Sequence, residues 1–497
     1  MENLLGGEWL KKRYKLYAYH LTHSSYTGTR AKIETSENGD IVETYPAHYA
    51  PAQEPLLHIE FYIKYDDINL DFLNAVFKCL VIEEVATYIQ KKPRGRYERK
   101  VGILFEYLTG QQLPVPDLGK ENYIDLLDKD RYVTGKVIKN ARWNINDNLL
   151  GNVDFCPIIR KTNRLESSLQ EDFQKLIEDV TNEFPKEIFY RAVNYLYTKE
   201  TRSSYQIEKE KPSMERVLRF VSLLEKAGGQ SIDALLSESS LTNLQNEIID
   251  ERYAAKGFRD FQNYIGQTTY NFKEIIHYVC PPPEFISSIM NGLLQAAKKS
   301  EGTHPIARAA IVAFGFVFAH PFEDGNGRLH RFLIHDVLTR DKLVQKGMII
   351  PVSAHMVNHI KEYDAALEAY STPLMSRIKY ELKDASGMVV TNPAQVEAYF
   401  RYPDLTEQTI YLANTIKGTI TEDIYWEMDF LVKYDEVKKA IQDVVDMPDR
   451  NTDMMIRFLH QNKGELATRK RKHFAELTDD EISQMEAAFK EVFEIVS

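Results

Sequence analysis

Two apolar segments near the middle of the chain are joined by the stretch His320-Pro321-Phe322-Glu323-Asp324-Gly325-Asn326-Gly327-Arg328-Leu329-His330-Arg331. Residues 304–319, which precede it, carry hardly any polar side chain, and this predicts a helix that is buried on all sides. Thr303 is the expected N-cap of this helix, and Pro305 is tolerated in its first turn. Residues 332–338, which follow the stretch, repeat apolar side chains at helical spacing. The stretch is therefore expected to form a polar loop between two buried helices.

The loop combines groups that suit the binding of a phosphate chain. Gly325-Asn326-Gly327 can take positive φ angles, so that successive backbone N–H groups form an anion-binding nest at the start of a helix. Arg328 and Arg331 lie three residues apart on one face of that helix and can meet the same polyphosphate. Asp324 is a hard oxygen ligand, suited to a Mg²⁺ that also touches phosphate. His320 can accept a proton near neutral pH, and the set predicts transfer from a nucleotide to a hydroxyl.

The order of the whole stretch carries more weight than any part of it. A Gly-Asn-Gly turn alone is more typical of an ordinary surface loop. The complete stretch resembles the signature of the Fic (Fido) family, His-Pro-Phe-x-Asp/Glu-Gly-Asn-Gly-Arg-x-x-Arg, and it fills every specified position. The similarity extends over about residues 186–375 and includes Gly257-Phe258-Arg259, residues 278–283, residues 304–310, residues 351–353 and Tyr363. His330 is a departure, since many relatives carry a small residue there.

The resemblance implies AMPylation, the transfer of AMP from ATP to a Ser, Thr or Tyr hydroxyl of a protein, with release of pyrophosphate. His320 would then be the catalytic base, and Asp324 would hold Mg²⁺ between the α- and β-phosphates. Arg328 and Arg331 would bind the β- and γ-phosphates, and the Asn326 side chain would add a phosphate contact. The ATP-binding residues implied in this way are Asp324, Gly325, Asn326, Gly327, Arg328, Arg331 and Tyr363.

A second segment resembles the family's inhibitory helix, whose pattern is Ser/Thr-x-x-x-Glu-Gly/Asn. Within residues 201–211, Ser204 and Glu208 share one helical face at i, i+4, and Pro212 is expected to end the helix. The resemblance implies that Ser204 and Glu208 are regulatory. Glu208 would pair with Arg331 and block the productive ATP pose, so that the protein inhibits itself.

The spacing of this segment does not single it out, because Ser167 and Glu171 have the same spacing. The surrounding Ser-Ser-x-x-Ile-Glu context favours Glu208. Lys209 stands where the family usually has Gly or Asn, which affects the expected end of the helix. The alternative is an ordinary exposed glutamate on a charged helix end.

The expected fold is mainly α: a Fic-type helical core with a β-hairpin flap, a mixed α+β N-terminal region and a helical C-terminal appendage. The chain of 497 residues has room for two to four domains at about 100–200 residues each. We expect three: residues 1–165 (mixed α+β), residues 166–394 (the core, with the inhibitory helix at about 201–211 and the flap at about 266–280) and residues 395–497 (helical). Expected elements include strands at 57–63 and 136–138, a helix over 70–90, an extended pair at 378–382 and 388–391, and a capping box at 478–481.

Charge and cysteine usage limit the class of protein. There are 62 Lys+Arg against 73 Asp+Glu, a net charge of -11, which disfavours broad binding to nucleic acid or anionic membrane. The three cysteines, Cys79, Cys156 and Cys280, form no Cys-x-x-Cys pair and fit a reducing, cytoplasmic setting. No signal peptide or membrane span is expected. The expected ligands are ATP as substrate and Mg²⁺, and the expected partner is a protein substrate. Self-modification and a homo-oligomer stay open.

Two alternatives remain. The first keeps the fold but changes the chemistry to de-AMPylation, UMP transfer, phosphotransfer or phosphocholine transfer; intact Asp324 and both arginines favour ordinary use of ATP. The second is a non-catalytic regulatory scaffold that touches DNA through Arg469-Lys470-Arg471-Lys472-His473. Short basic runs in acidic proteins are usually solvated faces, so the second is the weaker.

Overall fold

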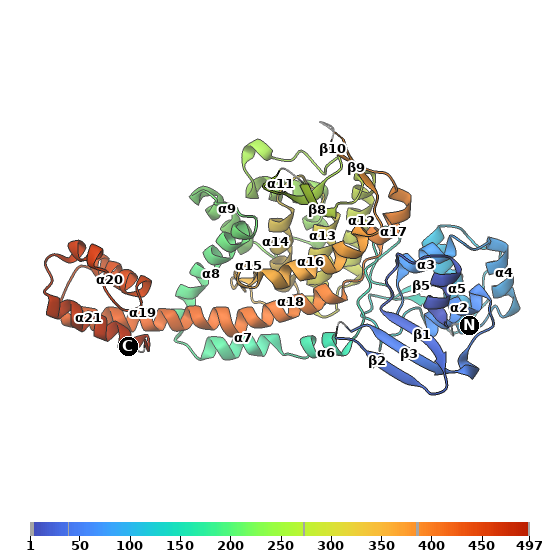
Figure 1. The fold of residues 1–497 in the computed structure, drawn as a ribbon, viewed down its shortest axis with the longest axis horizontal. Coiled ribbons are helices and arrows are strands. Elements are labelled where there is room, and N and C mark those ends of the chain that lie inside the picture. The colour runs from blue at the N-terminus through green and yellow to red at the C-terminus, as the bar shows by residue number, and fades with distance from the viewer. Residues whose placement is uncertain (1–3, 38, 272–273, 384–386, 496–497) are drawn as a thin grey trace. The chain divides into compact units, whose positions relative to one another are not determined.

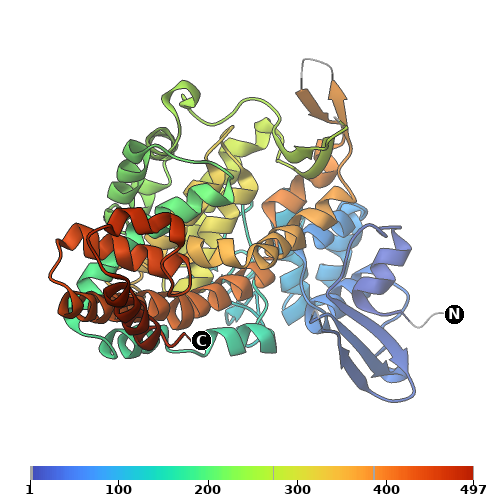
Figure 2. The same cartoon turned by 60° about the vertical axis from the view of Figure 1, so that its left-hand side comes forward.

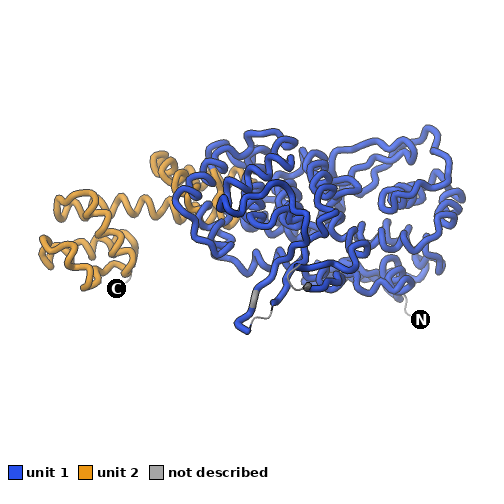
Figure 3. The backbone as a smooth tube through the Cα atoms, turned by 90° about the horizontal axis from the view of Figure 1, so that it is seen from above, with its two compact units in different colours: residues 1–171, 200–348, 352–416 blue, residues 172–199, 349–351, 417–497 orange. Residues whose placement is uncertain are grey.

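The computed structural model describes residues 4–37, 39–271, 274–383 and 387–495. These residues are mainly α-helical, with small two- and three-stranded sheets, and the expected fold class is confirmed (Figure 1). The chain divides into two compact units (Figure 3): residues 1–171, 200–348 and 352–416 form the first, and residues 172–199, 349–351 and 417–497 form the second. The division into three domains stays a prediction.

The N-terminal part of the first unit is mixed α+β. Its helices are α1 (Gly6–Arg13), α2 (Pro55–Tyr65), α3 (Leu70–Phe77), α4 (Ile82–Lys91), α5 (Arg96–Thr109) and α6 (Asn163–Leu169), with a 3₁₀ turn η1 (Ala47–Tyr49). One sheet has the order β1-β3-β2, from β1 (His23–Gly28), β2 (Lys32–Thr35) and β3 (Ile41–Pro46). A second has the order β4-β6-β5, from β4 (Ile124–Asp125), β5 (Ile138–Asn140) and β6 (Ile145–Asp147). In each sheet the central strand pairs in parallel on one side and antiparallel on the other.

Three expectations for this part need correction. The strand expected at 57–63 is wrong, because α2 covers it: Pro55 opens the helix, and its buried residues cluster at 58–59 and 61–63, one turn apart. The single helix expected over 70–90 is instead α3 and α4, separated at residues 78–81. The strand expected at 136–138 lies later, at β5. The apolar content of residues 57–63 suggested a strand, but burial against the surrounding helices determines the conformation of this segment.

The rest of the first unit is the helical core around the loop. Its helices are α9 (Met214–Glu225), α10 (Ile232–Leu235), α11 (Glu238–Ile248), α12 (Pro283–Lys299), α13 (Pro305–Ala319), α14 (Asn326–Arg340), α15 (Val352–Asn358), α16 (Ile360–Met375) and α17 (Pro393–Arg401), with a 3₁₀ turn η2 (Glu251–Tyr253). Every residue of α13 from Ile306 to Ala319 is buried, as expected for a central helix. Its N-cap is His304, whose Nδ1 accepts from the Ile306 N–H at 3.2 Å, and not Thr303. The Thr303 hydroxyl is used instead on the Ser300 carbonyl, at 2.7 Å.

Two hairpins extend from this core (Figures 1 and 2). The expected flap is an antiparallel pair, β7 (Tyr264–Thr268) with β8 (Glu274–Val279). Residues 272 and 273 of the flap lie outside the described residues. The expected extended pair is β9 (Tyr380–Lys383) with β10 (Gly387–Val390), also antiparallel.

The second unit is built from helices. They are α7 (Phe173–Asn182), the first part of α8 (Lys186–Ile207), the end of α18 (Thr406–Gly418), a π-helical segment η3 (Thr419–Ile424), α19 (Tyr425–Val444), α20 (Asp449–Gln461), η4 (Thr468–Phe474) and α21 (Asp479–Val492). Residues of α19, α20 and α21 form a core of their own. The expected capping box is confirmed: the Glu481 N–H donates to the Thr478 hydroxyl at 3.2 Å, and Glu481 Oε2 accepts from the Thr478 N–H at 2.6 Å. Among the described residues no helix is long and apolar enough to cross a bilayer.

The basic run Arg469–His473 lies in η4, and two of its cations are used locally. Arg471 donates to the carbonyls of Phe474 and Leu477 and pairs with Asp479 at 3.1 Å. The Lys470 ammonium lies over the Phe458 ring, 4.4 Å from its centre. Through these contacts Lys470 and Arg471 take part in the packing of the second unit.

Candidate functional site

The loop leaves α13 and enters α14 through two left-handed residues, and the two helices pack against each other (Figure 1). His320 caps α13 with φ 49° and ψ 58°, and its N–H donates to the Phe316 carbonyl at 3.0 Å. A left-handed backbone is uncommon outside glycine and costs about 1–2 kcal/mol. Gly325, with φ 87°, is the N-cap of α14, where glycine takes this conformation without strain. The N-terminus of α14, with its unpaired N–H groups, therefore faces the loop.

Asn326 closes the loop on itself. Its side chain is only 2% exposed. Its Oδ1 accepts from the Phe322 N–H at 3.1 Å, and its Nδ2 donates to the Phe322 carbonyl at 2.8 Å. Both polar ends of this side chain contact Phe322, and the phosphate contact expected of it stays a prediction. Asn326 shapes the nest, and its backbone N–H remains the group that can face an anion.

Arg328 is buried and held by two carboxylates. Its guanidinium is 0% exposed. Nη1 donates to Glu210 Oε2 at 3.1 Å, and Nη2 donates to Asp324 Oδ1 at 2.8 Å. Nη2 also forms an ion pair with Glu210 Oε1 at 3.0 Å. The Arg328 guanidinium lies over the Tyr205 ring, with its Cζ 5.1 Å from the centre of the ring. Asp324 itself is 53% exposed, so its carboxylate lies at the open side of the site.

Arg331 is equally buried and is held by the end of α8. Its Nε donates to the Ser204 hydroxyl and its Nη2 to the Ser204 carbonyl, both at 2.8 Å. Nη2 also donates to Glu208 Oε1 at 2.8 Å. Burial lowers the pKa of the Arg331 guanidinium, but the Glu208 carboxylate raises it and the net shift is upward. The structure thus brings together Glu208 and Arg331, the pair expected to meet, and adds Ser204 to the same contact.

Glu208 also lies directly against the nest. A Cβ added to Gly327 would come within 2.1 Å of Glu208 Oε1. Only a residue without a side chain at this position lets a carboxylate approach the backbone so closely. The site therefore already holds an anion, supplied by the chain itself.

The end of α8 is a Schellman motif. The Glu210 N–H donates to the Tyr205 carbonyl at 3.0 Å, and the Lys209 N–H donates to the Gln206 carbonyl at 2.9 Å. Lys209 has φ 58°, the left-handed conformation of the residue that follows the C-cap. Glycine is preferred at this position because it carries no Cβ, so Lys209 keeps the geometry at a cost in backbone strain. Glu208 occupies the C-cap itself.

Replacing Lys209 with Gly is expected to strengthen this helix end. The strain of a left-handed lysine is about 1–2 kcal/mol, and the greater freedom of glycine in the unfolded chain offsets about 0.5–1 kcal/mol of it. Lys209→Gly should therefore slow hydrogen exchange of the amides of residues 209 and 210 by about twofold to fivefold. Lys209→Ala keeps the Cβ and is the control, which should exchange as the wild type does. Faster exchange in Lys209→Gly would contradict the strain assigned here.

The imidazole of His320 is held in one tautomer. Its Nδ1 lies 3.3 Å from the Val317 carbonyl, which can only accept, so Nδ1 carries the proton and Nε2 is free to accept one. Burial, and next the nearby Arg259 cation, lower the pKa of His320 to about 4. The Arg259 Nε donates to the His320 carbonyl at 2.8 Å and fixes the backbone at this point. His320 is therefore a neutral acceptor at physiological pH.

Tyr363 and His330 lie within the packing of the core. Tyr363, on α16, is buried and lies beside His330 (ring centres 6.3 Å apart) and Tyr411 (5.9 Å). The ATP contact expected of Tyr363 stays a prediction. His330 is buried between α13 and α14, where its Nδ1 bonds the Ala313 carbonyl at 2.9 Å and its ring meets Phe314. His330, which is larger than the residue that many relatives carry there, thus faces α13.

Sequence reasoning missed one carboxylate that contacts this site and a second, buried one on the same face of α8. Glu210 contacts Arg328 as described. Glu200 accepts from His335 Nε2 at 2.8 Å and from the Ser353 N–H at 2.7 Å. Glu200, Ser204 and Glu208 recur every four residues, so the i, i+4, i+8 repeat on one face of α8 was the available signal for Glu200. Glu210 lies beyond the helix, and its contact depends on the left-handed turn at Lys209.

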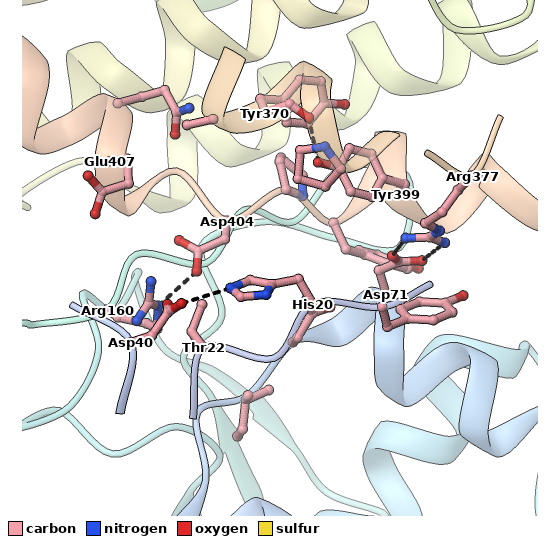
Figure 4. A pocket seen from close by; sticks show the side chains of 18 of the residues that line it. His20, Thr22, Asp40, Asp71, Arg160, Tyr370, Arg377, Tyr399, Asp404 and Glu407 are labelled. Carbon is pink, nitrogen blue, oxygen red and sulfur yellow. Dashed lines mark hydrogen bonds and ion pairs between the residues drawn. The ribbon is translucent and has the colours of Figure 1, made fainter. Parts of the chain in front are cut away.

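A separate cavity of about 460 Å³ lies in the same unit (Figure 4). Its charged side chains pair with one another: Arg377 donates to Asp71 at 2.5 Å, Arg160 to Asp404 at 2.8 Å and Arg164 to Glu407 at 3.0 Å. Figure 4 also shows His20 directed at Asp40, 3.0 Å away.

The model of the Fic/DOC family matches residues 235–338, which include the whole loop. This part of the chain is a Fic domain. A protein adenylyltransferase fic-1 from Caenorhabditis briggsae is 27% identical to this Fic protein over 284 residues, which are 48% of this chain and 53% of the relative. A protein adenylyltransferase Fic from Nematostella vectensis is 40% identical over 65 residues, or 13% of this chain and 15% of the relative. The Fic protein thus spans about half the length of the first relative and less of the second.

Solved structures of Fic proteins are also similar. A Fic family protein from Desulfovibrio desulfuricans G20 has a TM-score of 0.38 and 16% identity, covering 56% of this Fic protein and 80% of that chain. A Fic domain containing signaling protein from Bacteroides thetaiotaomicron has a TM-score of 0.36 and 16% identity. The match covers 54% of this chain and 97% of that one.

Proposed function

We propose that this Fic protein transfers AMP from ATP to a Ser, Thr or Tyr hydroxyl of a protein, releases pyrophosphate, and is inhibited by its own Glu208. The observation that carries the proposal is the position of the Glu208 carboxylate, which lies against the Gly327 backbone and accepts a hydrogen bond from Arg331. A site that holds a carboxylate between a helix N-terminus and a buried arginine also suits a phosphate group. The names of the curated relatives support the same reaction.

Three kinds of protein group carry out the proposed chemistry. The free Nε2 of His320 takes the proton of the incoming hydroxyl, and the hydroxyl oxygen forms its bond to the α-phosphorus. The bond from that phosphorus to the oxygen bridging to the β-phosphate breaks, and pyrophosphate leaves with its electron pair. Arg328 and Arg331 hold the β- and γ-phosphates, and the backbone N–H groups of residues 325–327 hold phosphate oxygens. Preorganised donors of this kind stabilise charge as it develops in the transition state.

Asp324 fits a role as the protein ligand of Mg²⁺. Its carboxylate is half exposed beside the nest, and one carboxylate with phosphate oxygens is a usual Mg²⁺ environment. Within the described ranges no cluster of three or more His, Cys, Asp or Glu side chains suits a metal, so Asp324 would share the ion with the nucleotide. When bound, Mg²⁺ would neutralise phosphate charge.

We also propose that the flap aligns the protein substrate. Among the described residues, β7 and β8 pair only with each other, so each strand has a free edge. An extended segment of the target can add to such an edge through backbone hydrogen bonds, which set its register without naming the protein.

Labelled ATP tests the reaction. The Glu208→Gly variant is incubated with ATP labelled at the α-phosphorus or at the γ-phosphorus, with a cell lysate and also alone, and protein-bound label is followed on gels. Label from the α position is expected on protein, together with release of pyrophosphate, whereas γ label should not be retained. Mass spectrometry then locates the AMP-bearing hydroxyl. Retained γ label would indicate phosphotransfer, and preferential labelling from UTP would indicate UMP transfer; either result would replace the proposal.

A further inference from the structure

Two acidic residues, not one, face the loop from the end of α8. Glu208 and Glu210 flank the left-handed Lys209, and each contacts a different motif arginine. The turn at Lys209 is what directs both side chains at α14. The contact of Glu210 with Arg328 is therefore built by the same Schellman motif that positions Glu208.

The contact between Glu210 and Arg328 is a two-point one. Nη1 and Nη2 of the buried Arg328 reach the two oxygens of Glu210 at 3.1 and 3.0 Å. Nη1 makes a charge-assisted hydrogen bond and Nη2 completes an ion pair, and a phosphate would use the same two donors. The side chain of Glu210 is 32% exposed, so the contact can be displaced from solvent.

Further contacts hold Glu210 in place. Arg216 Nη2 donates to Glu210 Oε2 at 3.1 Å. Arg216 is itself fixed to the Ile248 carbonyl by Nε at 3.3 Å and by Nη2 at 3.2 Å. The Tyr205 ring lies 5.0 Å from the Arg216 guanidinium and 5.1 Å from that of Arg328. Glu210 thus bridges two cations that share one aromatic ring.

We propose that Glu210 is a second restraint, which occupies Arg328 as Glu208 occupies Arg331 and determines how tightly the site binds nucleoside polyphosphates. A phosphate chain that reaches Arg328 must take its Nη donors from Glu210, and the carboxylate repels the incoming charge until it moves. Removing Glu208 alone therefore leaves the site half restrained. This inference rests on the proposed use of ATP and goes beyond it by assigning a separate role to Glu210.

Direct binding tests the inference. The affinities of MgATP and of AMP are measured by calorimetry for the full chain as wild type, Glu210→Gln, Glu208→Gly and the double variant. Glu210→Gln should tighten MgATP by about threefold to tenfold, the range for a charged contact that is partly exposed. The double variant should bind MgATP tighter than Glu208→Gly by a similar factor. AMP lacks the β- and γ-phosphates, so its affinity should change by less than about twofold. Glu215→Gln, an exposed glutamate at the start of α9, is the matched control and should leave both affinities unchanged.

The outcomes separate the two proposals. Unchanged MgATP affinity in Glu210→Gln, with the double variant equal to Glu208→Gly, overturns the role of Glu210. An equal gain for AMP also overturns it, because the effect would then be a general loosening of the site. Tighter MgATP binding in Glu210→Gln without any transfer of α label supports the restraint and contradicts AMP transfer. Failure of every variant to bind MgATP contradicts both.

Discussion

His320→Ala is expected to lower the rate of AMP transfer by about 10²–10⁴-fold, the usual contribution of a positioned general base. The comparison is made in the Glu208→Gly background, where the rate is high enough to measure. The loss should fall on kcat and not on MgATP affinity, because no contact with a phosphate is assigned to the imidazole. His48→Ala removes an exposed histidine and should leave the rate unchanged. Transfer at the parent rate in His320→Ala would contradict the role of His320 as general base.

The pH dependence gives a second measure of the same base. The pKa of His320 is lowered to about 4, first by burial and then by Arg259. A bound polyphosphate adds negative charge near the imidazole and should raise this pKa back toward its ordinary value of 6.5. A base acts when deprotonated, so rates fall as pH falls through its pKa. The profile of kcat/KM reports the free enzyme and should stay level down to about pH 5, whereas kcat should begin to decline at a higher pH than kcat/KM does.

Glu208→Gly is expected to raise self-labelling from α-labelled ATP by about tenfold or more. A hydrogen bond between charged groups contributes about 1.5–3 kcal/mol, and the lower part of that range applies because the Glu208 side chain is 35% exposed. The substitution frees Arg331 and clears the space over Gly327 in one step. The measurement is the initial rate of label incorporation at an ATP concentration below KM.

Two controls accompany this activation. Glu171→Gly alters the other Ser-x-x-x-Glu sequence and should leave labelling at the wild-type level. Glu208→Gln keeps the size of the side chain and removes its charge, so it should activate less than Glu208→Gly does. No gain in Glu208→Gly, with the protein folded as judged by thermal unfolding, would count against self-inhibition.

The sequence was sufficient where a local pattern determines the structure. The apolar run before His320 predicted the buried helix α13, and the glycines around Asn326 predicted the turn into α14. It misled where tertiary packing determines the outcome, as at residues 57–63, whose β-branched and aromatic content suits a strand although the buried face has helical spacing. Such a conflict between local preference and burial cannot be resolved before the neighbouring helices are known.

The candidate site shows the same limit. The pairing of Glu208 with Arg331 was foreseen, because a resemblance supplied a contact that spans 123 residues of sequence. The contact of Glu210 with Arg328 spans 118 residues and has no such guide, since it depends on a left-handed lysine in place of the usual glycine or asparagine. The Asn326 side chain was assigned to phosphate because its type allows that contact. Its burial and its two bonds to Phe322 add a role in shaping the loop, which the residue type alone did not indicate, and the phosphate contact stays a prediction.

Gly327 has a consequence for how this protein can change. The missing side chain at this position makes room for Glu208, and under the proposed mechanism the phosphate chain of ATP needs the same room. A methyl group added there is then expected to crowd the Glu208 carboxylate and the phosphate chain alike. Variants that escape inhibition must therefore arise in the end of α8, and the balance between the resting and active forms can be tuned there without rebuilding the catalytic loop. Under the proposed mechanism, the Glu208 carboxylate and ATP compete for the space over Gly327, so a rise in ATP concentration is expected to release part of the inhibition.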